Sequence, residues 1–188
     1  MTVRPITIVG HPALHKPTKK VKEVTPEIRK LVADMFETNE AAEGAGLAAT
    51  QVGSRWRIFV YSCTDGNGEL QEGHVINPVL EKGAIPTLTE DMWEGCLSVP
   101  GEGFPTARSE WARVTGTDLD GNPVVVEDTG GVLARCLQHE VDHLDGKLYL
   151  DRLNPQYRRE AQQAVSERGW QKQGIKSWDP SAQKADEI

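Results

Sequence analysis

Two histidines four positions apart, with a glutamate beside the first, constrain this chain more than any other feature. The segment is His139-Glu140-Val141-Asp142-His143, and it lies in an apolar run with helical spacing. Positions four apart share one face of a helix, so both imidazoles can reach a single metal ion. The Glu140 carboxylate can then act as general base on a metal-bound water. The segment therefore predicts a hydrolytic metal site, and its alternative is a surface helix that carries these residues by chance.

The composition is that of one ordinary domain. The chain has 188 residues, of which 38% are hydrophobic and 26% charged, enough for a core of its own. We expect a single catalytic domain over residues 1–170 and a polar, poorly ordered tail over residues 171–188. No run approaches the roughly 18 apolar residues that cross a bilayer, and we find no secretory signal. Three widely spaced cysteines fit reduced thiols or metal ligands, so we expect a cytoplasmic protein without membrane contact.

Charge is unevenly distributed along the chain. The net charge of −7 argues against nucleic-acid binding over the whole surface. Residues 152–176 differ, because six Lys or Arg side chains against two Glu give +4 and leave −11 on the remainder. This stretch is either an ordinary solvated helix or a contact site for ribosomal RNA. Its basic residues are Arg152, Arg158, Arg159, Arg168, Lys172 and Lys176.

The spacing of apolar residues predicts helices and hairpins. A cap followed by proline, Thr25-Pro26, begins a helix that runs to about Glu43. Two hairpins follow, each with a turn of Asp, Gly and Asn residues. Their strands are expected at residues 57–61 and 74–80, and at residues 114–117 and 124–126. Without regular alternation of strand and helix, these elements indicate an α+β fold.

The helix with the two histidines is expected at the centre of that fold, with small antiparallel sheets packed around it. It follows Gly131 and closes at Asp145-Gly146. A last helix begins at Asn154-Pro155 by the same cap-then-proline rule. The residues expected to be buried by the central helix are Val132, Leu133, Leu137 and Leu144.

A catalytic metal site needs a third protein ligand besides two histidines. Cys96 is the preferred candidate, since a thiolate is a strong ligand and Gly95 lets the backbone approach the ion. A lone cysteine is, however, more often a small buried hydrophobe. Cys136 is the rival, one turn before His139, but its short side chain would have to reach along the helix. The residues alone leave both cysteines open.

Three segments of the chain, taken together, resemble the signature motifs of the peptide deformylases. In order they are Gly-Ala-Gly-Leu-Ala-Ala-Thr-Gln at 44–51, Glu-Gly-Cys-Leu-Ser at 94–98 and Gln-His-Glu-Val-Asp-His-Leu-Asp-Gly at 138–146. Residues 10–14 also resemble the N-terminal segment of that family, and the likeness covers roughly Thr7 to Leu153. One departure is Gly103, where some members carry an arginine, so contacts assigned to that arginine are not carried over. The resemblance also suggests that Arg108 pairs with Glu94.

The resemblance implies a role for each candidate residue. Cys96, His139 and His143 would hold the metal, and Glu140 would move protons. The Gln51 side chain and the Leu97 backbone N–H would donate to the developing oxyanion. Gly44, Gly46 and Gly95 would let an extended peptide bind the loop backbone, although a helix-ending turn also explains the first two. Gln138 and Asp142 are either partners of the metal ligands, with Asp142 favoured for orienting a histidine, or solvated helix positions.

A deformylase of this kind would remove the N-formyl group from nascent polypeptides that begin with formyl-methionine, releasing formate. The resemblance implies one divalent ion, Fe²⁺ in the cell, with Zn²⁺, Ni²⁺ or Co²⁺ also able to occupy the site. The partners would be N-formyl-methionyl peptides, nascent chains and, through the basic C-terminal segment, the ribosome. A zinc endopeptidase, which takes a third histidine or a glutamate downstream, is the first alternative. The residues after His143 offer Asp145 and Asp151 but no histidine, and that alternative does not explain the Cys96 motif. A non-catalytic metal-binding relative is the second, and the presence of Glu140 and Gln51 argues against it.

Overall fold

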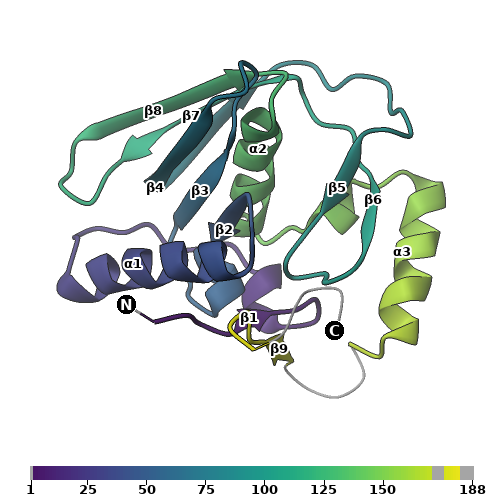
Figure 1. The fold of residues 1–188 in the computed structure, drawn as a ribbon, viewed down its shortest axis with the longest axis horizontal. Coiled ribbons are helices and arrows are strands. Elements are labelled where there is room, and N and C mark those ends of the chain that lie inside the picture. The colour runs from purple at the N-terminus through teal and green to yellow at the C-terminus, as the bar shows by residue number, and fades with distance from the viewer. Residues whose placement is uncertain (1, 171–175, 183–188) are drawn as a thin grey trace.

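A five-stranded antiparallel sheet is the main sheet of this computed structural model, which describes residues 2–170 and 176–182. Helix α2 (Val132–Leu144) lies between it and the strands β5 (Trp93–Gly95) and β6 (Gly103–Pro105) (Figure 1). The strands follow the order β2-β3-β4-β7-β8 across the sheet. Each strand is hydrogen-bonded to its neighbours in antiparallel register. Their bounds are β2 Gly46–Ala48, β3 Ile58–Thr64, β4 Leu70–Lys82, β7 Trp111–Thr117 and β8 Pro123–Thr129. The two expected hairpins are therefore present, with strands longer than the sequence indicated.

Both faces of the sheet are covered. Successive side chains of β3 point to opposite faces, so this strand contributes to the core on each side. Ile58 and Val60 join a core cluster with helix α1 (Pro26–Ala41), whereas Phe59 and Tyr61 join a second cluster with helix α2 (Val132–Leu144). A strand buried on both faces reads as a continuous apolar run, which β3 does. The sheet therefore separates two cores and presents α2 on one of its faces.

Helix α1 begins as the sequence predicts. The Thr25 side chain accepts a hydrogen bond from the backbone N–H of Ile28, and Pro26 occupies the first turn. The helix ends at Ala41, two residues before the expected end, and Glu43 has a positive φ of 53°. A non-glycine residue in this conformation closes the turn that leads into β2. That turn places residues 44–46 beside α2.

Helix α2 is capped from outside its own sequence. Its N-cap, Gly131, has no side chain, and the Asp128 carboxylate instead accepts hydrogen bonds from the backbone N–H groups of Ala134 and Gly66. Leu133, Leu137 and Leu144 are buried as expected. The expectation for Val132 is wrong, because its side chain is 48% exposed at the start of the helix. The first turn of α2 therefore borders solvent, and the later turns lie in the core.

Two small antiparallel pairs complete the fold. Strands β5 (Trp93–Gly95) and β6 (Gly103–Pro105) form one, and β1 (Ile6–Thr7) and β9 (Ser177–Trp178) form the other. Helix α3 (Pro155–Glu167) lies beside β6 (Figure 1). Short 3-10 helices occupy Pro12–His15, Ala49–Val52 and Tyr149–Arg152.

The strand pair β1–β9 corrects the expectation of a poorly ordered tail. Trp178 pairs with Ile6 and is only 2% exposed, so this part of residues 171–188 is packed into the core. The rest of that expectation concerns residues 171–175 and 183–188, which lie outside the described residues. None of the helices in residues 2–170 and 176–182 has the length and apolar character that a bilayer crossing demands.

Candidate metal centre

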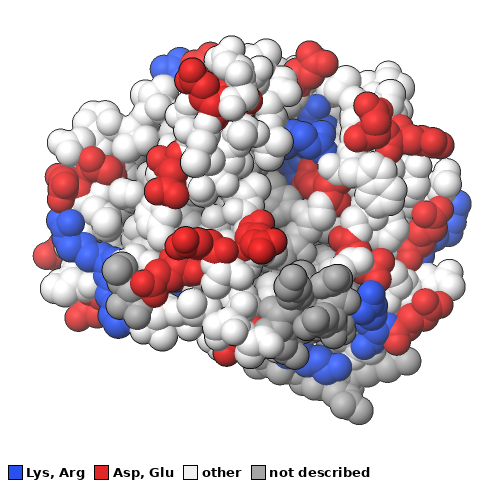
Figure 2. All heavy atoms as spheres, in the orientation of Figure 1, with Lys and Arg blue, Asp and Glu red and all other residues white. Residues whose placement is uncertain are grey.

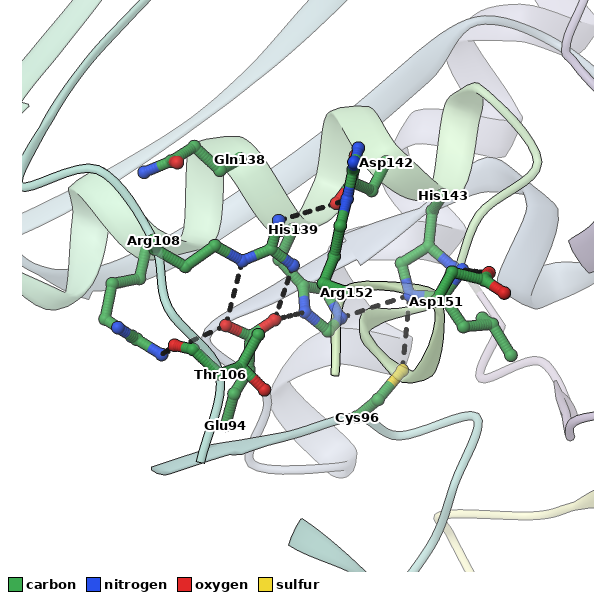
Figure 3. A network of polar contacts seen from close by, with 12 residues as sticks. Glu94, Cys96, Thr106, Arg108, Gln138, His139, Asp142, His143, Asp151 and Arg152 are labelled. Atoms are coloured by element: carbon green, nitrogen blue, oxygen red, sulfur yellow. Dashed lines mark hydrogen bonds and ion pairs between the residues drawn. The ribbon is translucent and has the colours of Figure 1, made fainter. Parts of the chain in front are cut away.

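Three potential ligand atoms from α2 and the segment after β5 converge at one point (Figure 3). The Nε2 atoms of His139 and His143 are 3.1 Å apart, and the Cys96 sulfur is 3.2 Å from the His143 Nε2. All three atoms lie within 4.8 Å of one another. Cys136 is not part of this group, because its thiol donates to the backbone carbonyl of Ala45 at 3.4 Å. The structure therefore brings the preferred cysteine, Cys96, to the histidines.

Glu94, rather than Asp142, contacts a histidine of the group. The Nδ1 atom of His139 lies 2.7 Å from a Glu94 carboxylate oxygen, which leaves Nε2 free to face Cys96 and His143. Burial would raise the pKa of Glu94, but hydrogen bonds from His139 and Arg108 outweigh it and hold that pKa well below its usual value. The carboxylate is therefore charged and fixes the orientation of the imidazole. The expectation that Asp142 orients a histidine is wrong, since Asp142 pairs with Arg108 and Arg152.

Arg108 connects the two carboxylates behind the histidines. Arg108 is 4% exposed, and its guanidinium donates to Glu94, as the resemblance suggested, and also to Asp142 on α2 (Figure 3). A buried arginine with two carboxylate partners is fully compensated, and removal of Arg108 would take a buried cationic partner from both carboxylates at once. Gln138 has another task, because its side-chain amide exchanges hydrogen bonds with the backbone of Ser109. These contacts fix α2 against the chain that leads into β7.

Glu140 is buried beside the three ligand candidates. Glu140 is 3% exposed, and this burial raises the pKa of its carboxyl group to about 7. One carboxylate oxygen, Oε2, has no hydrogen-bond partner among the described residues. Gly46 lies directly against this carboxylate, since a Cβ there would come within 2.8 Å of Oε1 and 2.6 Å of the Cys136 sulfur. Glycine at position 46 is therefore explained by the close approach of Glu140 and Cys136.

Gln51 reaches the same point from the 3-10 helix after β2. Its carbonyl oxygen accepts a hydrogen bond from the backbone N–H of Ala48, which leaves the amide nitrogen aimed at the Cys96 loop. That nitrogen lies 3.3 Å from the Ser98 hydroxyl and 3.8 Å from the Cys96 sulfur. The side chain is 1% exposed. It is therefore a fixed N–H donor next to the ligand group.

A groove of about 460 Å³ leads to this group and includes the predicted site residues other than His143 among its lining. Figure 2 shows a hollow of this kind between the part of the surface over β2 and α2 and the part over β5 and β6. Trp93 and Val132 at the groove are 63% and 48% exposed. Packing requires glycine at position 44 but not at position 95. A Cβ at Gly44 would lie 2.4 Å from the Asn39 side chain, whereas a Cβ at Gly95 would make only an ordinary van der Waals contact. Gly103, the departure noted above, pairs with Gly95.

The donor set suits a transition-metal ion. One thiolate and two imidazoles with converging atoms match the preferences of zinc and iron(II), and the second nitrogen of His139 is held by a carboxylate. The unpartnered Oε2 of Glu140 lies in the same buried region, where a water at the metal would satisfy it. The residues present therefore fit a resident metal ion with one open position.

Fold and site together define a metal-dependent hydrolase. Residues 3–159 match the sequence profile of the family described as Polypeptide deformylase. The chain is 52% identical to peptide deformylase 2 of Corynebacterium efficiens over 184 residues, covering 96% of this chain and 94% of that protein. It is also 52% identical to a peptide deformylase of Mycolicibacterium paratuberculosis over 192 residues, covering 96% of this chain and 95% of that protein.

Solved structures agree with these relatives. The crystal structure of peptide deformylase from Ehrlichia chaffeensis in complex with actinonin has a TM-score of 0.76 and 39% identity, with 89% of this chain and 98% of that chain covered. A peptide deformylase from Legionella pneumophila gives the same TM-score at 33% identity, with 92% and 100% covered. The chain belongs to the peptide deformylase family, and it removes the N-formyl group from nascent polypeptides.

Proposed function

We propose that Cys96, His139 and His143 hold one divalent ion and that Glu140, Gln51 and Leu97 carry out the hydrolysis. The observation that carries this proposal is the convergence of the Cys96 sulfur and two Nε2 atoms beside the unpartnered Oε2 of Glu140. A divalent ion held by these three residues would lower the pKa of a water molecule and polarise a carbonyl group. Fe²⁺ is the ion we propose for the cell, with Zn²⁺, Ni²⁺ or Co²⁺ as substitutes. Metal analysis of anaerobically purified protein tests that identity.

Glu140 serves as the proton carrier in this mechanism. Its carboxylate takes a proton from the attacking water and later gives it to the leaving amine, so that formate and a free N-terminus result. Burial raises the pKa of the Glu140 carboxyl group, so it accepts a proton more readily than an exposed carboxylate and can still release that proton to the more basic amine. The close fit of Gly46 against Glu140 keeps the carboxylate in one position.

Two N–H groups would stabilise the negative charge that develops on the formyl oxygen. The Gln51 amide nitrogen is held toward the Cys96 loop by the contact between its carbonyl oxygen and Ala48. The backbone N–H of Leu97 follows Cys96 directly and is the second donor. Neither group carries a titratable proton, so both stabilise the charge without neutralising it. The remaining peptide would extend along the groove past Gly44, Gly46 and Gly95.

Exchange of the two cysteines for alanine tests the ligand set. We expect Cys96→Ala to lose bound metal and activity, because a three-ligand site is reduced to two imidazoles. Cys136→Ala is the matched control: its sulfur contacts Ala45 rather than the histidines, so the variant should keep the metal. The reverse pattern would place all three ligands on α2 and overturn the proposal. Metal content per chain, measured on both purified variants, decides between them.

Contact with the ribosome in the cytoplasm is a separate proposal for the basic segment. Its support is the +4 charge of residues 152–176. Several of these side chains already have partners, since Arg152 pairs with Asp142 and Arg168 with Glu102. Arg158 and Lys176 donate to backbone carbonyls, and Lys172 lies outside the described residues. Arg159 is the exposed member on α3 that remains to contact a phosphate.

Arg159→Glu tests this contact without disturbing the fold. We expect it to weaken co-sedimentation with ribosomes at low salt and to leave deformylation of a free formyl-peptide unchanged. Lys22→Glu makes the same charge change at an exposed position outside this segment and serves as the control. Equal co-sedimentation of both variants and the parent would exclude a ribosome contact through Arg159.

A further inference from the structure

The C-terminal strand β9 contacts the loop that carries Cys96. The indole N–H of Trp178 donates a hydrogen bond of 2.8 Å to the backbone carbonyl of Leu97. Trp178 is 2% exposed, and its backbone pairs with Ile6 of β1. The match to the deformylase family ends at residue 159, so this contact comes from a part of the chain beyond the family profile.

The carbonyl that Trp178 contacts belongs to the same peptide group as the N–H of Ser98. That N–H donates to the Cys96 sulfur at 3.4 Å. The next carbonyl, that of Ser98, accepts a hydrogen bond of 2.8 Å from the backbone N–H of Val9. The Leu97–Ser98 peptide is therefore held on its oxygen side by the C-terminal strand, and its neighbour is held by the segment that follows β1.

Hydrogen bonds at the two ends of one peptide group strengthen each other. Donation to the carbonyl oxygen polarises the peptide and makes its N–H a better donor, an effect of about 10–30% per bond. Hydrogen bonds to a ligating sulfur set its orientation and its electron density, and so affect the affinity for a metal. A donor on the Leu97 carbonyl thus acts on the Cys96 sulfur through a single peptide plane.

We propose that Trp178 is a positioning residue for the metal centre: its indole N–H holds the Leu97–Ser98 peptide so that the Ser98 N–H donates to the Cys96 sulfur. The proposal rests on the role of Cys96 as a metal ligand. It also bears on the oxyanion donor, since the Leu97 N–H belongs to the preceding peptide and shares the Leu97 backbone angles. Loss of the indole N–H would therefore disturb both the ligand and the donor.

The test replaces Trp178 by Phe in the full chain loaded with Co²⁺, whose absorption reports a bound thiolate. Trp178→Phe keeps an aromatic ring in the core but removes the N–H. We expect the thiolate-to-Co²⁺ charge-transfer band to move to longer wavelength, because a sulfur that loses a donor holds its electrons less tightly. Co²⁺ affinity and kcat should each fall about threefold to tenfold, the range of one net hydrogen bond, with a smaller change in KM.

Trp170→Phe is the matched control, because Trp170 is a second buried tryptophan of the C-terminal region and is 3% exposed. The charge-transfer band and the Co²⁺ affinity of this control variant should equal those of the parent protein. If Trp178→Phe does not fold, replacement of Trp178 by 3-benzothienylalanine removes the N–H and keeps the shape of the indole. An unchanged band and Co²⁺ affinity in the folded Trp178 variant would overturn the positioning role. A parent band that persists in Cys96→Ala would instead refute ligation by Cys96, a failure of the proposed function itself.

Discussion

The two halves of the metal centre are built in different ways. One half consists of His139, Glu140 and His143, which lie within five residues of one helix, and this helix packs on the five-stranded sheet. The other half, around Cys96, lies in an irregular segment that is held by Gln51 and by both terminal segments. The spacing of the helical half is fixed by local geometry, whereas that of the loop half depends on residues far away in sequence. Substitutions outside the site should therefore act mainly on the loop half.

Glu140→Ala is expected to have the largest effect, and it acts on chemistry alone. Both proton transfers are lost, so kcat should fall by about 10²–10⁴-fold while the metal stays bound. His139→Ala is the contrasting helix variant and should lose the metal as well. Metal content and kcat, measured on the same preparations, separate the two. Metal loss in Glu140→Ala equal to that in His139→Ala would mean that Glu140 is a ligand.

Gln51→Ala tests the donor on the loop half. Loss of one oxyanion donor should lower kcat by about 10²–10³-fold, with a much smaller change in KM. Ser98→Ala removes a contact of the Gln51 amide but leaves the amide in place, so its effect should be smaller. Steady-state kinetics on a formyl-peptide measures both variants. A change confined to KM would show that Gln51 only binds substrate.

Glu94→Gln cuts the connection between the two halves, since Glu94 lies on β5 and contacts His139 on α2. The variant keeps an oxygen near Nδ1 but loses the charge that fixes the imidazole and pairs with Arg108. Metal affinity should fall about 10–100-fold. Glu127→Gln, at the exposed ion pair with Arg113 on the far edge of the sheet, should leave affinity unchanged. Competition with a chelator of known affinity gives both values, and equal affinities would exclude an orienting role.

Asp128→Ala gives the smallest effect and acts on the stability of the helical half. Two backbone N–H groups, those of Ala134 and Gly66, lose a largely buried acceptor. The free energy of unfolding should fall by about 1–3 kcal/mol. Asp120→Ala removes an exposed carboxylate paired with Arg29 and should change it by less than about 1 kcal/mol. Denaturant titration of both variants measures the free energy of unfolding, and an equal change in the two would contradict the role of Asp128 as the cap of α2.

The helical half could be predicted from the sequence because its information is local. A cap residue followed by proline indicated α1 and α3, apolar spacing after Gly131 indicated α2, and apolar runs joined by turn residues indicated both hairpins. The strand pair β5–β6 was not predicted, since three residues such as Trp93-Glu94-Gly95 carry no readable alternation. Val132 was misassigned because helical spacing places it on the apolar face, but the groove opens at that turn.

The partners of the loop half could not be read from local pattern. Asp142 is the residue that the sequence favours for orienting a histidine, yet its tertiary contacts are with Arg108 and Arg152. Glu94 lies two residues before Cys96 in the same motif, and its suggested pairing with Arg108 was the one indication in the sequence that it belongs to the site. Trp178 gave no signal, since it lies in a polar stretch without periodicity. Its role depends on contacts between distant segments, which no local window contains.

The pairing of β1 with β9 also bears on the order of folding. Ile6 and Trp178 are 172 positions apart, so their contact closes a very long loop with strands of only two residues. Closing such a long loop costs conformational entropy, and strands of two residues offer few contacts to offset that cost. We therefore expect this pair to form after the hairpins of the five-stranded sheet. The same pair should open first in the native state, so the amide of Ile8, bonded to Lys176, should exchange its hydrogen earlier than those of β3. In refolding, the return of activity should therefore lag behind the return of secondary structure.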